Sequence, residues 1–514
     1  MKFKSFICYL VVVLMAMTGC VGGNNAPAAS NESNTNSGQT SRDSVNFSIA
    51  AEPSTLDPQK GNDLLTFAVH CQIFDTLIRE DTDGSLVPGL AEEWTISEDG
   101  KEIVFKLRKE VKFHNGDTMT ADDVVYSITR AINSSFTQRI TGSMEKAEKI
   151  DDSAVKLTLK YSYGPILDCI ATTNMAIVSQ KAVEADEEGF ARNPVGTGPF
   201  KFKEWSNGEK IVFESFSDYY RGEASIKNLT FKIMTDKTSA AVALENGEVD
   251  VLLSPALADR ANLISNENLA YYETESNSFY FIAFNNENGL FSNKLLREAV
   301  SYAVDREALI IGALEGNGAP LESAIPTNTF GAPKNFKANP YDVEKAKQLL
   351  TEAGHPNGLS VKLPTLYLEP TEVLQDQLRQ IGITAEIERM ERGAWLQDVY
   401  TDNKYEITVG SYSALVPDAD QITYNRYHGD FVGGGNNMVR CSIPELDAAL
   451  DLGRTSLSPE EREAAYLKAS EIIRDESIIV PLYSSMNGIA ANRDLKGVQA
   501  HPVQRCYVYE YTWN

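Results

Sequence analysis

The residue types best suited to catalysis or metal binding are scattered along this chain. Neither a His-Glu-x-x-His nor a Cys-x-x-Cys motif occurs, and no Gly-x-Ser-x-Gly nucleophile elbow is present. We therefore expect a protein that binds rather than catalyses and that carries no cofactor. Because catalytic triads can assemble from distant residues, a cell-surface hydrolase is the alternative from another class. The five histidines are His70, His114, His355, His428 and His501.

The first 19 residues have the pattern of a secretory signal. Lys2 and Lys4 supply a positive start, and an apolar run from Phe6 to Met17 follows. The run is shorter than the roughly 20 apolar residues that a membrane-spanning helix needs. It ends just before Cys20, in an arrangement that resembles the bacterial lipobox, where the thiol receives a lipid and the chain is cut before it. We expect lipidation at Cys20; a plain signal that ends near a cysteine is the alternative.

Residues 20–44 predict a flexible tether behind that anchor. They consist mainly of Gly, Asn, Ala, Ser and Thr, and their only charged residues are Glu32, Arg42 and Asp43. A segment with so little apolar bulk cannot bury a core, and its composition is that of a flexible linker. Acyl chains on Cys20 would hold the body on the membrane without a spanning helix.

Length and charge limit which classes of protein the chain after the signal can belong to. About 495 residues follow a signal of 19, which is too many for one core, so two or three domains are expected. The formal charge is −25, and removal of Lys2 and Lys4 with the signal makes it −27. This charge argues against nucleic acid, whose binding needs clustered Lys and Arg, and against adhesion to anionic lipid. We interpret it as a device for solubility outside the cell.

Four cysteines remain in the body after the signal and the lipid site are set aside. Disulfides are permitted outside the cell, but their pairing does not follow from spacing. Buried free thiols are an equally good interpretation. The four are Cys71, Cys169, Cys441 and Cys506.

Strands and helices alternate along the body, which predicts an α/β fold. Alternating patterns predict strands near 45–51, 94–96, 103–107, 154–159, 211–215, 229–234, 249–253, 361–366, 383–387 and 478–483. Helices are predicted over 63–79, 237–246, 371–381 and 395–400, and after the capping residues Thr120, Asp342 and Ser458. Such alternation indicates open sheets covered by helices, with ligands outside the strand ends, often between domains.

Ordered segments of the chain resemble the extracellular solute-binding proteins of family 5, which serve peptide and nickel ABC transporters. The most specific match is KFHNGD at 112–117 followed by TADDVVYS at 120–127. The others are EPSTLDP at 52–58, PGLAEEW at 88–94 with SEDGK at 97–101, PVGTGPF at 194–200, LREAVSYAVDR at 296–306 and EAG at 352–354.

The resemblance implies a periplasmic-binding-protein-like clamp of the class II, cluster C type, with two lobes and an extra smaller domain. Lobe I would combine 45–80, 194–283 and 481–514; the smaller domain would be 81–193, and lobe II 284–480. The partner would be a permease with two membrane subunits and two ATPases. The chain is then expected to act as a monomer, anchored by lipid to the outer side of the bacterial cell membrane, where it captures a peptide-like solute.

The peptide-binding relatives contain a segment resembling aromatic-x-Ala-Asp-Tyr-x-Asp-Pro, whose first Asp holds the peptide amine. The matching stretch here runs from Tyr412 to Asp420, and Leu415 stands where that Asp would be. The usual amine anchor is therefore absent. Asp418 is a candidate substitute, because a buried ammonium needs a charged acceptor; a solvated helix N-cap is its other interpretation. Tyr412 is expected at the ligand.

Nickel-binding relatives also lack that Asp, and some use a histidine just downstream. His428 lies in that region, and a neutral imidazole suits nickel or its chelate; a surface or loop histidine is the alternative interpretation. Arg426 is expected to pair with a solute carboxylate or with Asp430. Gly433, Gly434 and Gly435 predict a mobile loop at the mouth of the cleft. A sensor or adhesin that uses the clamp without transport is a further alternative.

Overall fold

The computed structural model describes residues 42–514 apart from residues 62, 82 and 434–435. The predicted signal at 1–19, Cys20, the tether up to residue 41, Gly434 and Gly435 lie outside the described residues. Residues 42–514 form one unit. None of its described helices combines the length and the apolarity needed to cross a membrane.

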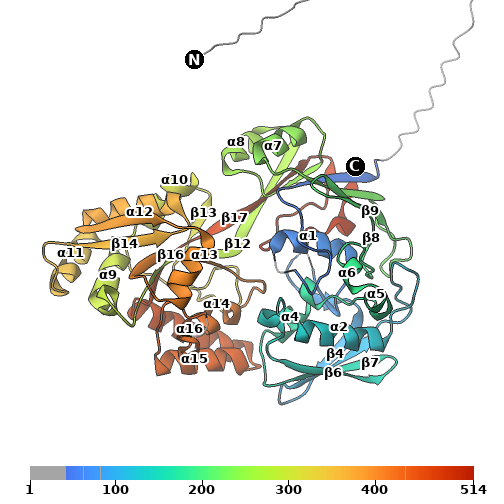
Figure 1. Ribbon diagram of the computed structural model, residues 1–514, viewed down its shortest axis with the longest axis horizontal. Coiled ribbons are helices and arrows are strands. Elements are labelled where there is room, and N and C mark those ends of the chain that lie inside the picture. The colour runs from blue at the N-terminus through green and yellow to red at the C-terminus, as the bar shows by residue number, and fades with distance from the viewer. Residues whose placement is uncertain (1–41, 62, 82, 434–435) are drawn as a thin grey trace, which may run out of the picture. The chain divides into compact units, whose positions relative to one another are not determined.

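A mixed sheet of eleven strands runs through this unit (Figure 1). Ten strands lie in the order β15-β14-β16-β12-β17-β11-β1-β10-β9-β8, and β13 pairs with β17. The bounds along that order are β15 Ile383–Arg389, β14 Leu359–Thr365, β16 Ile407–Ser413, β12 Leu269–Phe284, β17 Ile479–Asn492, β11 Val251–Leu253, β1 Ser44–Ile49, β10 Asn228–Ile233, β9 Lys210–Ser215, β8 Phe200–Ser206 and, off the path, β13 Gly318–Pro320.

Two long strands, β12 and β17, connect the two ends of this sheet. They pair antiparallel from Leu269–Asn492 to Ala283–Ile479, with a register shift between Glu275 and Phe279 in β12. On one side β12 pairs with β16, and on the other β17 pairs with β11. The sheet therefore joins the middle of the chain to its C-terminal region.

The first described strand, β1, lies inside the sheet. It runs parallel to both β10 and β11, and Phe47 is opposite Phe231 and Val251. Val45, Phe47 and Ile49 are fully buried, as the alternation of residues 45–51 predicts. The N-terminal strand is thus held between segments about 200 residues downstream.

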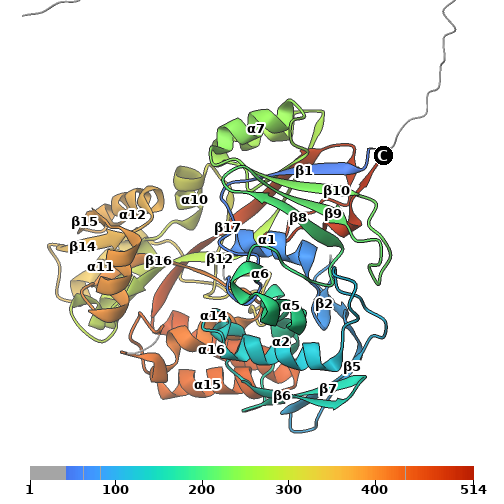
Figure 2. The same cartoon turned by 45° about the vertical axis from the view of Figure 1, so that its right-hand side comes forward.

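A second, four-stranded antiparallel sheet has the order β4-β5-β7-β6 and lies beside α2, as Figures 1 and 2 both show. Its strands are β4 Ala91–Ile96, β5 Glu102–Leu107, β6 Met144–Asp151 and β7 Ala154–Leu159, and α2 is Ala121–Asn133. The predicted cap at Thr120 is confirmed, and it forms a capping box: the Thr120 side chain accepts from the backbone N–H of Asp123, and the Asp123 side chain accepts from the backbone N–H of Thr120. Val124, Ile128 and Ala131 of α2 are buried against the sheet.

The remaining α-helices and short strands complete the unit. The helices are α1 Leu64–Ile73, α3 Gln138–Thr141, α4 Ile166–Ile170, α5 Gln180–Ala185, α6 Glu187–Phe190, α7 Lys237–Glu245, α8 Arg260–Ser265, α9 Lys294–Ala303, α10 Arg306–Leu314, α11 Val343–Glu352, α12 Leu368–Gln380, α13 Arg392–Leu396, α14 Ala419–Tyr427, α15 Pro444–Thr455 and α16 Pro459–Asp475. The short strands are β2 Ile78–Glu80, β3 Leu86–Pro88, β18 Leu495–Lys496 and β19 Thr512–Trp513.

The helix predicted over 63–79 was too long. Asp63 caps α1, which ends at Ile73, and residues 78–80 form β2 instead. The carbonyl of Ile73 accepts from the backbone N–H of Gly198, and a Cβ on Gly196 would lie 2.0 Å from the same oxygen. The PVGTGPF segment is therefore a close backbone crossing at the end of α1, which only glycine permits.

Candidate functional site

The segment that follows β16 leaves the sheet and packs against the N-terminal part of the unit. Tyr412 is paired with Phe279 of β12 near the end of the strand. Leu415, which is 7% exposed, and Val416 then enter a hydrophobic core whose other buried members lie between residues 67 and 177. Leu415 thus fills an apolar site where a carboxylate would be unpaired. Pro417 is followed by Asp418, which starts α14.

Asp418 is the N-cap of α14, but it is not solvated. Its carboxylate accepts from the backbone N–H of Asp420 at 2.9 Å, and it is only 2% exposed. Arg462 of α16 donates to both carboxylate oxygens at 2.8 Å. Burial raises the pKa of Asp418 to about 6, although Arg462 acts in the opposite direction. The N-cap prediction is confirmed, and the expected exposure was wrong.

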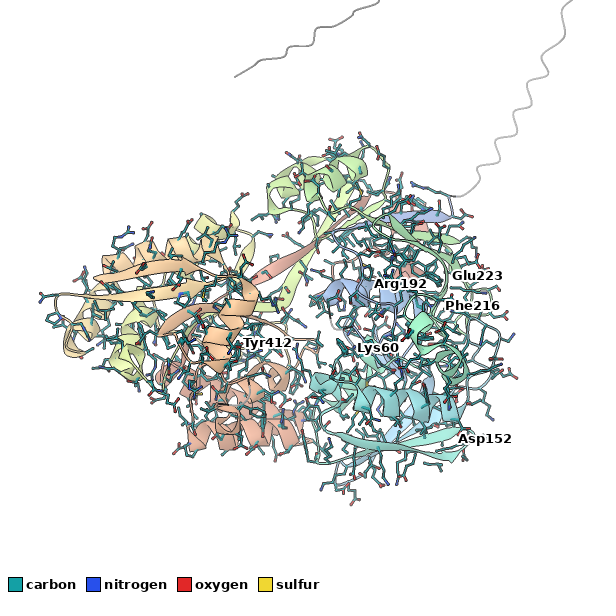
Figure 3. All side chains as sticks on the ribbon, in the orientation of Figure 1. Lys60, Asp152, Arg192, Phe216, Glu223 and Tyr412 are labelled. Atoms are coloured by element: carbon teal, nitrogen blue, oxygen red, sulfur yellow. The ribbon has the colours of Figure 1, made fainter. Side chains whose placement is uncertain are left out.

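Tyr412 holds two guanidinium groups from different parts of the chain. The guanidinium carbon of Arg426, on α14, lies 3.4 Å from the Tyr412 ring centroid, and that of Arg139, on α3, lies 4.9 Å from it. Arg139 also donates to the Tyr412 hydroxyl and, at 3.0 Å, to the carbonyl of Ser413. Tyr412 is labelled in Figure 3. The sequence predicted Tyr412 and Arg426 as site residues, and the structure places them in contact.

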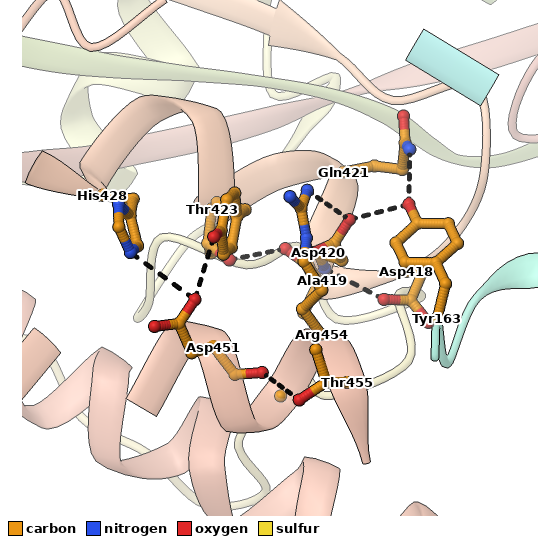
Figure 4. A network of polar contacts seen from close by, with 12 residues as sticks. Tyr163, Asp418, Ala419, Asp420, Gln421, Thr423, His428, Asp451, Arg454 and Thr455 are labelled. Carbon is orange, nitrogen blue, oxygen red and sulfur yellow. Dashed lines mark hydrogen bonds and ion pairs between the residues drawn. The ribbon is translucent and has the colours of Figure 1, made fainter. Parts of the chain in front are cut away.

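These three side chains line a cavity of about 310 Å³, which we call the arginine cavity. Its wall also contains Asp420 and Arg454, whose guanidinium donates to both carboxylate oxygens of Asp420 at 2.7 and 3.1 Å. The Tyr163 hydroxyl donates to Asp420 at 2.7 Å, which joins the segment before α4 to α14 (Figure 4). The cavity is therefore built from two parts of the chain that are far apart in the sequence, residues 138–163 and residues 412–454.

Arg426 is not paired with Asp430, which was one of its two expected partners. Its side chain is buried, and its nearest polar contact is the Tyr400 hydroxyl at 3.5 Å. Its Nε has no hydrogen-bond partner among the described residues. Asp430 is instead close to His428, whose Nδ1 lies 3.8 Å from a carboxylate oxygen. The other expected partner of Arg426, a solute carboxylate, is compatible with this position.

His428 follows α14 in the connection to the next short helix and is buried, so the expected loop position is confirmed and the expected surface exposure was wrong. Its Nδ1 accepts from the backbone N–H of Asp430 at 3.2 Å, and its ring stacks on Tyr424 with centroids 4.7 Å apart. Its Nε2 faces Asp451 at 3.6 Å (Figure 4). No three His, Cys, Asp or Glu side chains of the described chain come together as metal ligands.

A second cavity, of about 480 Å³, lies next to Pro417 and is lined by the C-terminal segment 497–511 and by Asn328 and Phe330. Two of its charged residues form an ion pair: Arg505 contacts Glu80. Burial raises the pKa of Glu80, but Arg505 and His501 outweigh it and lower that pKa to about 2. Asp168 also lines this cavity.

Asp168 has no hydrogen bond or ion pair with another side chain among the described residues. Burial, with the charges of Asp418 and Glu80, raises its pKa to about 7. A carboxylate with such a pKa in a cavity is a candidate functional residue. The sequence analysis missed it, because Asp168 stands alone within an apolar helix.

The arginine cavity also contains residues that the sequence analysis missed. Arg139 and Tyr163 are separated from Arg426 by more than 250 residues, and no local motif marks either of them. Arg454 lies near the end of α15, where a basic residue is usual for its interaction with the helix dipole. A search restricted to motifs could not have distinguished these side chains from ordinary surface residues.

Comparisons with known proteins agree with this architecture. Residues 85–434 match the family of bacterial extracellular solute-binding proteins, family 5, in its middle region. The glutathione-binding protein GsiB of Salmonella choleraesuis is 29% identical over 89% of this chain and 92% of its own length. HbpA2 of Haemophilus parasuis is 25% identical with a TM-score of 0.85, over 92% of this chain and 100% of that one. DppA of Helicobacter pylori, solved with the peptide STSA, is 26% identical with a TM-score of 0.77, over 92% and 98% of the two chains.

Proposed function

Because the chain belongs to the bacterial extracellular solute-binding proteins of family 5, we propose that it captures a peptide-like solute and delivers it to the permease of an ABC importer. Two relatives support a peptide-like solute, since one is a glutathione-binding protein and the other was solved with the peptide STSA. Proteins of this family work outside the cytoplasm. The chain captures its solute without chemical turnover and acts as a monomer.

The observation that carries the proposal is the arginine cavity. Its volume of about 310 Å³ falls at the lower end of the range of small-molecule sites, roughly 300–1,000 Å³. Arg139 and Tyr163 belong to the proposed smaller domain, and Tyr412 and Arg426 belong to the proposed lobe II. A solute bound here would contact the smaller domain and lobe II at once, and contacts of this kind favour a closed form.

The proposed division of the chain follows the sheets. Lobe I comprises 45–80, 194–283 and 481–514, the smaller domain 81–193, and lobe II 284–480. In support, the four-stranded sheet lies wholly within 81–193. The strands β8, β9, β10 and β11 lie within the lobe I segments, as does β1 apart from its first residue, Ser44. By these bounds the long pair β12 and β17 lies almost wholly in lobe I, and only its end at Ala283–Ile479 reaches lobe II. We place the hinge at that end of the pair.

A lipid on Cys20 is proposed to hold the protein on the outer face of the cell membrane. The proposal rests on the lipobox-like sequence around Cys20 and on the polar stretch that follows it. Replacing Cys20 with Ala is expected to release the protein into the medium or the periplasm, measured by cell fractionation. Continued attachment of the variant to the membrane would contradict lipidation at this residue.

Nickel or a metal chelate is the alternative solute, and it depends on His428. The Nδ1 of His428 already accepts a backbone hydrogen bond, so only Nε2 could coordinate a metal. That nitrogen faces Asp451 at 3.6 Å. One imidazole nitrogen is a weaker basis than the arginine cavity, and we therefore prefer the peptide-like solute.

Native mass spectrometry of residues 21–514 as purified tests the proposal. An added mass that fragments as a short peptide is expected; a nickel isotope pattern would favour the alternative. An empty protein that no peptide stabilises in a thermal-shift screen would contradict the peptide proposal.

Two further measurements test the class of protein. Recovery of a supplied peptide intact is expected, whereas its turnover would favour a hydrolase. Loss of peptide uptake after gene deletion would separate an importer component from a sensor or adhesin.

A further inference from the structure

The second cavity, beside Pro417, is separate from the arginine cavity. The two share no lining residue, and the second is the larger, at about 480 Å³ against about 310 Å³. We call it the C-terminal cavity, because much of its wall comes from residues 497–511. The wall also includes Asp168 of the proposed smaller domain and Phe330 of the proposed lobe II. A ligand bound in this cavity would therefore contact all three proposed parts of the chain.

The charges on the wall of the C-terminal cavity favour a cation. Three carboxylates line it, those of Glu80, Asp83 and Asp168, and a single guanidinium, that of Arg505. Arg505 forms an ion pair with Glu80, and His501 lies 3.3 Å from the same carboxylate. Burial lowers the pKa of His501, so its ring adds no positive charge near neutral pH. Asp83 is exposed to solvent, which leaves Asp168 as the enclosed carboxylate without an opposite charge on the wall.

The groups that face Asp168 are themselves negative or already paired. It lies near the charges of Asp418 and Glu80, and each of these carboxylates has its own arginine. Arg462 pairs with Asp418, and Arg505 pairs with Glu80. Burial and the two neighbouring carboxylates raise the pKa of Asp168 to about 7, while Arg462 acts in the opposite direction. A carboxylate in this position is stabilised when a cation comes beside it, so a cation in the cavity would pair with Asp168.

Tyr511 supplies a second acceptor in the same cavity. It is 1% exposed, and its hydroxyl has no hydrogen-bond partner in the described part of the chain. A buried hydroxyl without a partner costs free energy, which a donor in the cavity would offset. The rings of Tyr511, Tyr507 and Phe330 form aromatic surface on the wall, and such surface attracts organic cations. A primary ammonium group suits both acceptors, because it carries a positive charge and three N–H donors.

We propose that the C-terminal cavity is a second ligand site, which binds a small molecule through a primary ammonium group, with Asp168 as the paired carboxylate and Tyr511 as the second acceptor. The inference goes beyond the proposed function, because the site shares no lining residue with the arginine cavity. This separation favours a free amine, bound in addition to the transported solute. A metal ion is a poorer match, since the described residues hold no group of three His, Cys, Asp or Glu side chains that could ligate one.

The test compares amines with neutral molecules of the same shape. Calorimetry of residues 21–514 at pH 8, where Asp168 is ionised, uses 1,4-diaminobutane against 1,4-butanediol and n-butylamine against n-butanol. Each amine is expected to bind at least about tenfold more tightly than its alcohol, as for other charge-assisted hydrogen bonds. Equal binding of amine and alcohol, or no binding of either amine, would overturn the inference.

Asp168→Asn assigns the effect to the cavity. The variant keeps the shape of the side chain and removes its charge, so we expect it to fold at pH 8 and to bind 1,4-diaminobutane at least about tenfold more weakly than the wild type. Tyr511→Phe removes only an acceptor and should weaken binding about threefold. Asp152→Asn changes an exposed carboxylate and is the matched control. Amine binding that is unchanged in Asp168→Asn would contradict the proposed pairing.

If Asp168→Asn does not fold, Tyr511→Phe and the comparison of amine with alcohol in the wild type carry the same test. Competition then identifies the source of the ammonium group. Simultaneous binding of trialanine and 1,4-diaminobutane is expected for a free amine. Displacement of the diamine by trialanine, but not by N-acetyltrialanine, would retain the pairing with Asp168 and overturn the separation of this site from the solute. A protein that binds the diamine through Asp168 but carries no peptide would keep this inference and lose the peptide proposal.

Discussion

Arg462 holds the carboxylate of Asp418 with two hydrogen bonds of 2.8 Å, one to each oxygen. Both residues are buried, and Arg462 also donates to the carbonyl of Gly453 at 2.8 Å. The pair therefore connects the start of α14 to α15 and α16. A carboxylate engaged in this way is poorly placed to accept a solute ammonium, although it was the candidate substitute for the missing anchor.

Replacing Asp418 with Asn is expected to destabilise the protein and to leave solute preference unchanged. The change leaves Arg462 buried without an opposite charge, which typically costs about 3–5 kcal/mol. Urea unfolding of residues 21–514 measures the loss. Asp376→Asn, which breaks an exposed pair with Arg379, is the control and should cost less than about 1 kcal/mol. Loss of solute binding at full stability would show that Asp418 is a ligand residue after all.

Asp168 is expected to make stability fall as the pH rises. Burial raises the pKa of Asp168 from 3.8 to about 7, so the native state holds its proton where the unfolded chain has released it. The contribution is fully present below pH 4 and is lost as the pH rises to about 7. Asp168→Asn should therefore be more stable than the wild type at pH 8 and similar to it at pH 4.

Unfolding curves at several pH values check this behaviour. Asp75, whose pKa burial also raises to about 7, should maintain part of the slope in the variant. Asp152 is exposed, and Asp152→Asn should follow the wild type at every pH. An Asp168→Asn variant with the same pH profile as the wild type would mean that Asp168 is not desolvated in solution.

Gly196→Ala is expected to destabilise the crossing of the PVGTGPF segment over α1. An added Cβ would lie 2.0 Å from the carbonyl oxygen of Ile73 and 2.7 Å from a ring carbon of Phe74. The backbone must shift to remove such a contact, and overpacking of this kind costs about 1–3 kcal/mol or more. Gly393→Ala is the control, because nothing lies within 4 Å of its Cβ position. Similar melting temperatures for the two variants would contradict this account.

The four cysteines of the described chain are free thiols and should react slowly in the native state. Burial raises the pKa of Cys71 to about 11 and that of Cys441 to about 12, so little thiolate forms at pH 8. A thiol reagent should titrate four groups in residues 21–514 after denaturation without reductant, and three in Cys71→Ala. Two groups fewer than expected in either protein would indicate a disulfide.

Much of the secondary structure followed from local signals. The capping residues Thr120, Asp342 and Ser458 each begin a helix at the predicted place, and the turn at 97–100 joins β4 to β5. The strand β12 was not predicted. Its partners β16 and β17 come more than 120 residues later. The sequence of β12 has no clear strand pattern by itself, and its extended conformation depends on pairing with both of these strands.

The sequence by itself determined the family, the alternation of helices and strands and the absence of an aspartate at Leu415, since these depend on neighbouring residues in an ordered series of motifs. Only the tertiary structure decided which charges meet. The sequence allowed Asp418 to be an amine anchor. In the folded protein Arg462, 44 positions away, neutralises its carboxylate. In the sequence Arg426 is an ordinary helix residue. The structure places the Tyr412 ring against both Arg426 and Arg139, and it does not pair Arg426 with Asp430. Electrostatic partners are chosen by distance in space, and burial sets the strength of their interaction; neither is recorded in the local sequence.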